Sequence, residues 1–273
     1  MAGNAHKTPF KDLMAFGHDV ADLTGKTVLP YFRTGLSVEN KAPAGNYDPV
    51  TKADRAAERV IAKALKARFP DHTLVGEEYG TSQGTSRYRW VVDPIDGTRA
   101  FIMGSPLWGT LIGLVDGDEP IFGLMDQPFT GERFWSDQKA SYLRVRDGKP
   151  KRLKTRACNS LKEAILTSTH HNLFEDAHQK AVLTRFNETV RMTRYGGDCY
   201  GCCLLAAGFV DIVIEPGLKT YDIVALIPII ERAGGKVTSW TGGPASGGGN
   251  VIASGDPQLH EAALKLIAKA ARS

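Results

Sequence analysis

The segment V-V-D-P-I-D-G-T, residues 91–98, places Asp93 and Asp96 close together with Pro94 between them. Like charges at this spacing repel each other. The proline can restrict the turn by itself, so the fold does not require both acids. A bound cation would explain why both are present, and carboxylates are ligands that suit Mg²⁺ or another hard cation.

Further acidic residues stand where sites form in layered folds. Glu77 and Asp93, with Asp96 beside it, follow predicted strands, and Asp222 opens a late helix. Residues just past strand ends tend to collect at one site in α/β proteins. The Ile95 carbonyl could face the same ion, and no nearby imidazole or thiolate suggests zinc. The sequence therefore predicts a site for a hard divalent cation.

The Gly97-Thr98 pair suits a bound anion. Gly97 allows close approach of the backbone, and the two amides could face a phosphate as the start of a helix does. Metal and phosphate sites would then abut, as phosphoryl transfer to water requires. No Ser, Cys or His stands with a base that would make it a nucleophile, so we expect direct attack by water.

The first half of the chain predicts the elements that position these residues. Apolar residues at helical spacing and strand-forming runs mark them. The predicted helices cover 10–28 and 54–69, and the predicted strands cover 72–76, 91–92 and several antiparallel segments within 108–136. The stretch 35–49 is rich in Gly, Pro and Asn, which predicts a mobile loop.

The second half alternates strands and helices, which predicts α/β layers. The predicted strands cover 164–169, 210–215, 236–240 and 250–254, and the predicted helices cover 175–189, 199–208, 222–233 and 257–271. We expect a boundary near residue 155. It would separate an N-terminal α+β subdomain, 1–155, with most metal ligands from a C-terminal α/β subdomain, 156–273, with the substrate pocket and the last ligand.

The composition limits the possible partners. Hydrophobic residues make up 42% and charged residues 23%, as in ordinary globular proteins. The net charge of +4 is spread over scattered Lys and Arg, which argues against a nucleic-acid partner. No apolar run approaches the roughly 20 residues of a membrane span. The N-terminus has no secretory pattern, so we expect a cytoplasmic protein without a membrane partner.

The four cysteines, Cys158, Cys199, Cys202 and Cys203, give no zinc pattern. Three of them crowd into C-Y-G-C-C, and a zinc site would need a further Cys or His pair nearby. Buried reduced thiols on a helix of small residues are the favoured interpretation, and they fit a reducing cytoplasm.

Four ordered motifs give the chain its resemblance to a known family. They are D-P-V-T-K-A-D at 48–54, G-E-E at 76–78, D-P-I-D-G-T at 93–98 and Y-D-I-V-A at 221–225. Their order and spacing resemble the inositol monophosphatase superfamily of magnesium-dependent, lithium-sensitive phosphatases across nearly the whole chain. The resemblance implies an αβαβα sandwich, two or three Mg²⁺ ions, a small phosphate-ester substrate and a homodimer.

The resemblance also implies a ligand set. One Mg²⁺ would be held by Glu77, Asp93 and the Ile95 carbonyl. A second would be held by Asp93, Asp96 and Asp222, with Asp93 bridging. A third, looser ion could bind near Glu77.

Catalytic roles follow from the same resemblance. Asp54 and Thr98 would position and deprotonate the attacking water, and Glu77 would also take part. The Gly97 and Thr98 amides would bind the phosphate, and Glu78 would lie behind the metal ligands.

The segment 194–215 would line the leaving-group pocket. The substrate-binding residues implied there are Arg194, Gly197, Asp198, Cys199 and Glu215. Asp198 replaces the small or hydroxyl residue usual in inositol phosphatases, and Tyr221 replaces the usual Trp. Asp198 and Glu215 would form an acidic pocket suited to a cationic alcohol. The segment looks most like the histidinol-phosphatase branch, whose substrate carries an ammonium group and an imidazole.

Three functions therefore stay open. The first is hydrolysis of L-histidinol phosphate to L-histidinol and phosphate, in histidine biosynthesis. The second is hydrolysis of inositol 1-phosphate or a related sugar phosphate. The third is a metal-dependent binding protein without turnover, which the complete acid set disfavours.

Structural alternatives stay open for single residues. Asp54 and Asp198 could each merely cap a helix. Asp96-Gly97 could be a plain turn, and Glu77-Glu78 a solvated edge. Arg99 could line the phosphate site or simply be exposed.

The adjacent His170 and His171 could suggest a metal pair. Neighbours on a strand point to opposite faces, so we expect no shared role for them. The loop T-G-G-P-A-S-G-G-G-N, 241–250, resembles a phosphate cradle but lacks the Lys-Ser/Thr ending of a nucleotide loop, so it predicts a surface turn.

Overall fold

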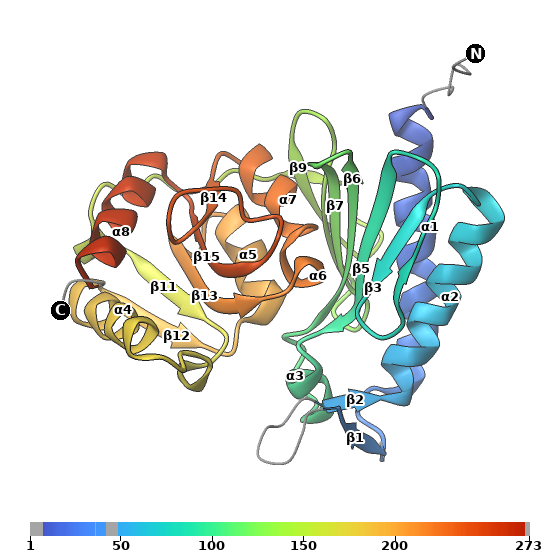
Figure 1. The fold of residues 1–273 in the computed structure, drawn as a ribbon, viewed down its shortest axis with the longest axis horizontal. Helices are drawn as coiled ribbons and strands as arrows, with labels where there is room; N and C mark the ends of the chain where they lie inside the picture. Colours follow the sequence, from blue (N-terminus) through green and yellow to red (C-terminus); the bar gives the residue numbers. More distant parts are fainter. Residues whose placement is uncertain (1–7, 36, 42–48, 271–273) are drawn as a thin grey trace.

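An eight-stranded sheet occupies one half of the computed structural model, which describes residues 8–35, 37–41 and 49–270 (Figure 1). In spatial order its strands are β10 (Lys151–Arg152), β9 (Ser141–Val145), β8 (Glu132–Ser136), β7 (Glu119–Gln127), β6 (Gly109–Asp116), β5 (Tyr88–Asp96), β3 (Thr73–Gly76) and β4 (Gly80–Ser82). Neighbours are antiparallel except β3 and β5, which run parallel. The carboxyl ends of β3 and β5 therefore meet at one edge of the sheet.

A five-stranded sheet occupies the other half. Its spatial order is β12 (Met192–Tyr195), β11 (Ile165–Ser168), β13 (Ile212–Leu218), β15 (Gly249–Ser254) and β14 (Lys236–Ser239). β11 runs parallel to both β12 and β13, and the remaining pairs are antiparallel. Residues that follow β11 therefore lie beside the middle of β13.

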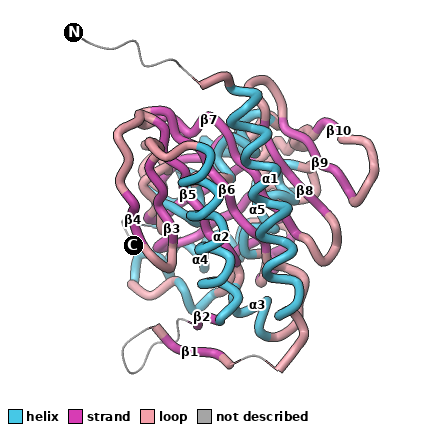
Figure 2. Tube along the Cα trace, turned by 90° about the vertical axis from the view of Figure 1, so that its right-hand side faces the viewer, coloured by secondary structure: helices cyan, strands magenta, loops and turns pink. Residues whose placement is uncertain are grey.

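Helices form three layers around the two sheets. α1 (Phe10–Val28) and α2 (Lys52–Arg68) cover the outer face of the eight-stranded sheet, where Figure 2 shows them in front of the strands. Between the sheets lie α5 (Asp198–Ala206), α6 (Thr220–Ile223) and α7 (Leu226–Arg232). α4 (Ala177–Thr189) and α8 (Pro257–Ala270) cover the outer face of the second sheet. The predicted αβαβα layering is confirmed.

Short elements join these layers. They are α3 (Thr98–Ile102), the 3₁₀ turns η1 (Leu29–Tyr31), η2 (Leu161–Glu163) and η3 (His171–Leu173), and the strands β1 (Val38–Asn40) and β2 (Pro49–Thr51). β1 and β2 form a small antiparallel sheet below α2. The stretch 35–49 was predicted to be a loop, and this is wrong for residues 38–40 and 49, which belong to the strands β1 and β2. Residues 36 and 42–48 lie outside the described residues.

Apolar side chains fill each boundary between layers. α2 buries Ala57, Ile61 and Leu65, four residues apart in sequence, as an amphipathic helix does. The helix ends at Arg68. Phe69 lies outside it, because Pro70 disfavours helical geometry in the residue that precedes it. All four cysteines are buried and unbridged, in agreement with the prediction of reduced thiols.

Two further differences from the sequence analysis concern helices. The helix predicted at 222–233 is divided into α6 and α7, with a break at Val224 and Ala225. α5 begins at Asp198, one residue before the predicted start. The first sheet ends at Arg152 and the second begins at Ile165, while the subdomain boundary near residue 155 stays a prediction. Among the described residues, no helix is long and apolar enough to cross a membrane.

Candidate active site

A bulge at the end of β5 presents the first two acids. Asp93 pairs with Leu111 of β6 and Asp96 pairs with Gly109, so two residues of β5 lie opposite a single residue of β6. Such a bulge re-aims the side chains beside it. The Ile95 N–H donates to Asp93 Oδ1 at 3.0 Å, which fixes the Asp93 carboxylate.

The third acid comes from the other half of the chain. Asp222 lies on α6, and the residues after it sit on a flat patch that Gly113 and Gly123 form on neighbouring strands. A Cβ at Gly123 would lie 1.8 Å from the Ala225 carbonyl oxygen, so only glycine permits this approach. The two glycines therefore seat α6 against the sheet and bring Asp222 to the end of β5.

Asp93, Asp96 and Asp222 form one acid cluster. Each offers a carboxylate oxygen, and these atoms all lie within 4.8 Å of one another. Burial, followed by the charges of Glu77 and the neighbouring acids, raises the pKa of Asp93 well above its usual range. Burial and the Asp222 charge do the same to the pKa of Asp96, and burial raises the pKa of Asp222 to about 7.

The acid cluster fits a hard divalent cation. Within the described ranges, no lysine or arginine forms an ion pair with any of its three members. One buried carboxylate, Asp93, and two half-buried ones without a counter-charge repel each other, and a cation removes that penalty. Oxygen ligands alone suit Mg²⁺ rather than zinc. The plain-turn interpretation of Asp96-Gly97 does not explain why Asp222 joins them.

Glu77 and Glu78 follow β3 at the same edge of the sheet. They stand outside the three-carboxylate group, and the Lys41 ammonium lies 2.8 Å from a carboxylate oxygen of each. Partial burial lowers the pKa of Lys41, but the bonds to Glu77 and Glu78 outweigh it and raise that pKa above its usual value. The Glu78 side chain is almost fully buried, so this pair is not a solvated edge. Sequence analysis missed Lys41, because a lysine in a loop carries no signal of its own.

Asp54 combines both interpretations that the sequence left open. Its Oδ2 accepts the Thr51 N–H at 2.9 Å and the Thr51 hydroxyl, which completes a capping box at the start of α2. Its Oδ1 is buried and has no hydrogen-bond partner among the described residues. Burial raises the pKa of Asp54 to about 6, against the effect of the bonds from Thr51. One oxygen therefore holds the helix, and the other is open to a proton or a water.

The Gly97-Thr98 pair lies between β5 and α3. Gly97 adopts a left-handed conformation with φ of 85°, which favours glycine. The Thr98 hydroxyl donates to the Ile95 carbonyl at 3.1 Å, so this carbonyl and the hydroxyl face each other. α3 packs against β2, the strand that leads directly into α2, which places Thr98 and Asp54 on neighbouring segments.

The first turn of α5 joins the two halves of the molecule. The Cys199 N–H donates to Asp96 Oδ1 at 2.9 Å, across 103 residues of sequence. Asp198 has a φ of 43° and is the first residue of α5, whose N-cap is Gly197, so Asp198 does not occupy the capping position and the cap interpretation is wrong. A Cβ at Gly97 would lie 3.3 Å from Asp198 Cβ, so Asp198 stands directly beside the predicted phosphate site.

Glu215 of β13 lies close behind Asp198. Its carboxylate is buried and accepts the Thr169 N–H at 2.7 Å, the Thr169 hydroxyl at 3.0 Å and the Ser168 hydroxyl at 3.4 Å. Burial raises the pKa of Glu215 to about 8, with a further contribution from the Asp198 charge. Burial also raises the pKa of Asp198 to about 6. Asp198 and Glu215 therefore make this side of the site acidic.

Other predicted residues occupy less central places. Arg194 is exposed on the edge strand β12, and none of the described contacts links its side chain to Asp198 or Glu215. Gly197 precedes α5 and packs against Thr167. Tyr221 is partly buried, and burial raises its pKa.

The reason given for separating His170 and His171 is wrong. They lie in and before η3 rather than on a strand, and their rings stack with centroids 4.3 Å apart. His170 accepts the Asn172 N–H through Nδ1 at 3.1 Å, so it caps this turn.

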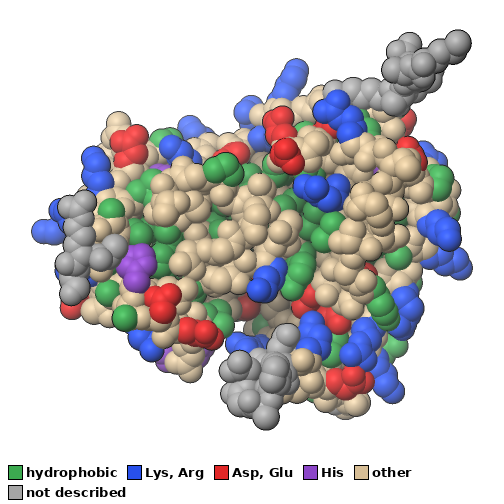
Figure 3. Space-filling view, viewed as in Figure 1, with side chains coloured by type: hydrophobic (Ala, Val, Ile, Leu, Met, Phe, Trp, Pro, Cys, Tyr) green, Lys and Arg blue, Asp and Glu red, His purple; other side chains and the backbone are tan. Residues whose placement is uncertain are grey.

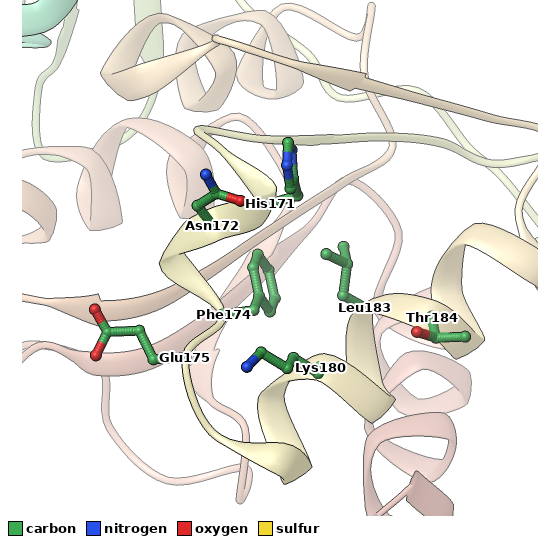
Figure 4. Close-up of a pocket in the computed structure, with 7 residues that line it drawn as sticks. All are labelled: His171, Asn172, Phe174, Glu175, Lys180, Leu183 and Thr184. Carbon is green, nitrogen blue, oxygen red and sulfur yellow. The ribbon is translucent and has the colours of Figure 1, made fainter.

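Two cavities lie away from the acid cluster. One, of about 490 Å³, lies over η3 and α4, where Figure 4 shows Phe174 and Leu183 between the polar residues. The other, of about 560 Å³, lies between the β6–β7 turn and α7. Neither contains a residue of the acid cluster, so buried unpaired charge rather than cavity volume marks the site. The surface is hollowed between the two halves of the molecule (Figure 3).

Known proteins share this fold and sequence. The chain is 39% identical over 264 residues to the bifunctional phosphatase IMPL2, chloroplastic, of Arabidopsis thaliana, covering 93% of this chain and 74% of that protein. It is 32% identical to a histidinol-phosphatase of Streptomyces coelicolor, covering 93% of this chain and 96% of that one. A solved inositol monophosphatase from Zymomonas mobilis is 37% identical with a TM-score of 0.83, covering 96% of this chain and all of that chain. Residues 11–272 match the model of the inositol monophosphatase family, and the chain belongs to this family of phosphatases.

Proposed function

We propose that this chain is a Mg²⁺-dependent phosphomonoesterase that hydrolyses L-histidinol phosphate to L-histidinol and phosphate, in histidine biosynthesis. The observation that carries the substrate assignment is the acidic pair Asp198 and Glu215 beside Gly97. Glu215 is buried and Asp198 is half-buried, and no ion pair of either is found among the described residues, although the charge of Arg99, against the effect of burial, lowers the pKa of Asp198. A cationic alcohol would add positive charge beside both acids. The names of the histidinol-phosphatase relatives support the same substrate.

Asp93, Asp96, Asp222, Glu77 and the Ile95 carbonyl would hold the Mg²⁺ ions. Bound Mg²⁺ supplies positive charge beside the phosphoryl oxygens and lowers the pKa of nearby water. A cation would also compete with Lys41 for the Glu77 carboxylate, because both attract the same oxygens. The acid cluster supports at least one ion, and a second or third is part of the proposal.

The chain's own groups would carry the proton transfers. A water oxygen attacks phosphorus, and Asp54, through its open Oδ1, accepts the proton that the water loses. Thr98 orients the water through its hydroxyl. The Gly97 and Thr98 amides hold the phosphoryl oxygens. The ester P–O bond would break, and the leaving oxygen would take a proton from solvent water to become the alcohol.

The leaving group would lie against Asp198 and Glu215. Glu215 is held by Thr169 and Ser168, so its position exists before substrate binds. An ammonium group beside the two acids favours their charged forms and lowers their pKa values. A neutral polyol gains no such attraction. The proposed pocket therefore prefers a cationic alcohol.

The second candidate is inositol 1-phosphate or a related sugar phosphate, favoured by the 37% identity to a solved inositol monophosphatase. Phosphate release from L-histidinol phosphate and inositol 1-phosphate, each with Mg²⁺ and with a chelator, separates the candidates. We expect Mg²⁺-dependent release with a higher kcat/KM for histidinol phosphate. A higher kcat/KM for inositol 1-phosphate would instead support the second candidate. No release from either ester favours a metal-dependent binding protein. A homodimer and a cytoplasmic location stay predictions.

A further inference from the structure

Glu58 of α2 is a buried carboxylate that the proposed reaction does not use. It is 1% exposed, on the face of α2 that packs against the eight-stranded sheet. In the part of the chain that the structure describes, no lysine or arginine pairs with it. A buried carboxylate needs other donors to offset its loss of water. The identity of those donors points to its role.

Both Glu58 oxygens accept backbone N–H groups from the turn after β3. The Glu78 N–H donates to Oε2 at 2.7 Å, and the Tyr79 N–H donates to Oε1 at 3.0 Å. Bonds from N–H groups to a charged carboxylate are stronger than bonds between neutral groups. The backbone on the carboxyl side of Glu77 is therefore fixed to α2.

The residue on the other side of Glu77 is fitted to the same carboxylate. A Cβ at Gly76 would lie 1.9 Å from Glu58 Oε1, so the strand end leaves room for the carboxylate only because residue 76 is glycine. Glu58 thus contacts the chain both before and after Glu77. Lys41 holds the two side chains at this turn, whereas Glu58 holds its backbone.

We infer that Glu58 is a positioning residue: it fixes the direction in which Glu77 and Glu78 leave β3, and thereby sets the affinity of the site for Mg²⁺. The inference rests on the proposed role of Glu77 as a metal ligand. Groups that orient metal ligands typically change metal affinity or activity by about 10–100-fold when they are replaced.

The test variant is Glu58→Gln. Glutamine keeps the size of the side chain but faces one of the two N–H groups with an amide donor, so one bond is lost. We expect the dissociation constant for Mg²⁺, measured by calorimetry on the substrate-free protein, to rise by about tenfold or more. We also expect kcat at saturating Mg²⁺ to stay close to that of the wild type, because the reacting groups are unchanged.

A second variant reaches the same carboxylate without changing a charge. Gly76→Ala introduces the Cβ that collides with Glu58 Oε1, and we expect the same loss of Mg²⁺ affinity. Both changes act on one contact. The Mg²⁺ affinity of the double variant should therefore be no lower than that of the single variant with the lower affinity.

The matched control is Asp211→Asn. Asp211 is also fully buried and also accepts a backbone N–H, that of Ile165 at 2.7 Å, but it lies beside the second sheet and, unlike Glu58, is also paired with Arg156. We expect Asp211→Asn to lower the melting temperature and to leave the Mg²⁺ dissociation constant unchanged. This separates loss of a buried hydrogen bond in general from loss of the one behind Glu77.

Two outcomes have different meanings. If the wild type binds Mg²⁺, Glu77→Gln weakens it, and both Glu58→Gln and Gly76→Ala bind it normally, the inference is overturned while the proposed function stands. If the wild type shows no Mg²⁺ binding, or Glu77→Gln binds it normally, the proposed ligand set itself fails.

Discussion

Buried acids in this molecule have opposite partners in two regions. Between α1 and the eight-stranded sheet, Arg133 donates to Asp126 at 2.7 Å and to Asp22 at 2.7 Å. At the end of β5, Asp93 and Asp96 meet Asp222 with no such cation from the described chain. Asp126 and Asp93 are both buried, and the two regions differ in where the positive charge comes from.

The different sources of positive charge show that burial of an acid does not by itself indicate function. A buried pair such as Arg133 and Asp126 is complete without a ligand, so it serves the fold. The acid cluster is complete only with a cation from solution. An acid that is buried and lacks an internal cation is therefore the informative observation.

The largest expected effect comes from removing one charge of the acid cluster. Asp96→Asn should lower Mg²⁺-dependent turnover by about 100-fold or more. Asparagine can still accept the Cys199 N–H, and one repulsive charge is gone. The melting temperature without metal should therefore stay equal or rise. A phosphate-release assay and a thermal melt in chelator check both parts; near-normal turnover would refute the two-metal assignment.

The next prediction removes the cation from the Arg133–Asp126 ion pair, which serves the fold. Arg133→Leu leaves Asp126 buried without its cation, and should lower the free energy of unfolding by about 3–5 kcal/mol. Turnover per folded molecule should not change, because Arg133 contacts His18 and Asp22 of α1, on the face of the sheet opposite to α6. Urea denaturation gives the stability, and activity corrected for the folded fraction gives the control. An unchanged free energy of unfolding would show that this pair does not serve the fold as we describe.

The substrate pocket should give a smaller and selective effect. Asp198→Asn should weaken kcat/KM for histidinol phosphate by about 2–5 kcal/mol relative to inositol 1-phosphate, because one partner of a shielded ion pair is removed. Glu215→Gln should act in the same direction, and the two changes should be non-additive if both acids hold one ammonium. Kinetics on both esters and the melting temperature of each variant measure this. Equal losses on the two esters would remove the support for a cationic substrate.

The smallest expected effect is a pH dependence in metal-free buffer. Burial raises the folded-state pKa of Asp222 from 3.8 to about 7. The folded state therefore binds this proton more tightly, and its contribution to stability is present below pH 4 and is lost as pH rises to 7. The wild type should lose about 1–2 kcal/mol more stability than Asp222→Asn between pH 4 and 7. Denaturant titrations at both pH values test this, and saturating Mg²⁺ should abolish the difference.

Much of the first sheet could be predicted because its strands alternate or run apolar between clear turns. The acids also could be predicted, since Glu77 follows one such strand and Asp93 and Asp96 stand in the last turn-like stretch of another. Lys41 and Glu58 could not, because their roles depend on contacts between distant segments. A helical Glu at an amphipathic boundary gives no signal that it accepts N–H groups 20 residues later.

The division of the helix at 222–233 was missed although the sequence carries a signal for it. Pro228 has no N–H to donate to the Val224 carbonyl, which disfavours a continuous helix at Val224 and Ala225. These two residues also sit on Gly113 and Gly123. The glycines are visible in the sequence, but their partners are not. The reason given for His170 and His171 failed because they lie at a 3₁₀ turn after the strand and not on a strand.

The first turn of α5 has a consequence for how substrate range can evolve. Asp198 stands on the proposed leaving-group side, and the next residue donates its N–H to Asp96. A mutation that shifts this turn to admit a new alcohol also disturbs an acid of the reacting centre. Glu215 stands on a separate strand and has its own donors, so it can vary with less damage to turnover. Divergence toward new substrates should therefore begin at position 215 and reach position 198 later.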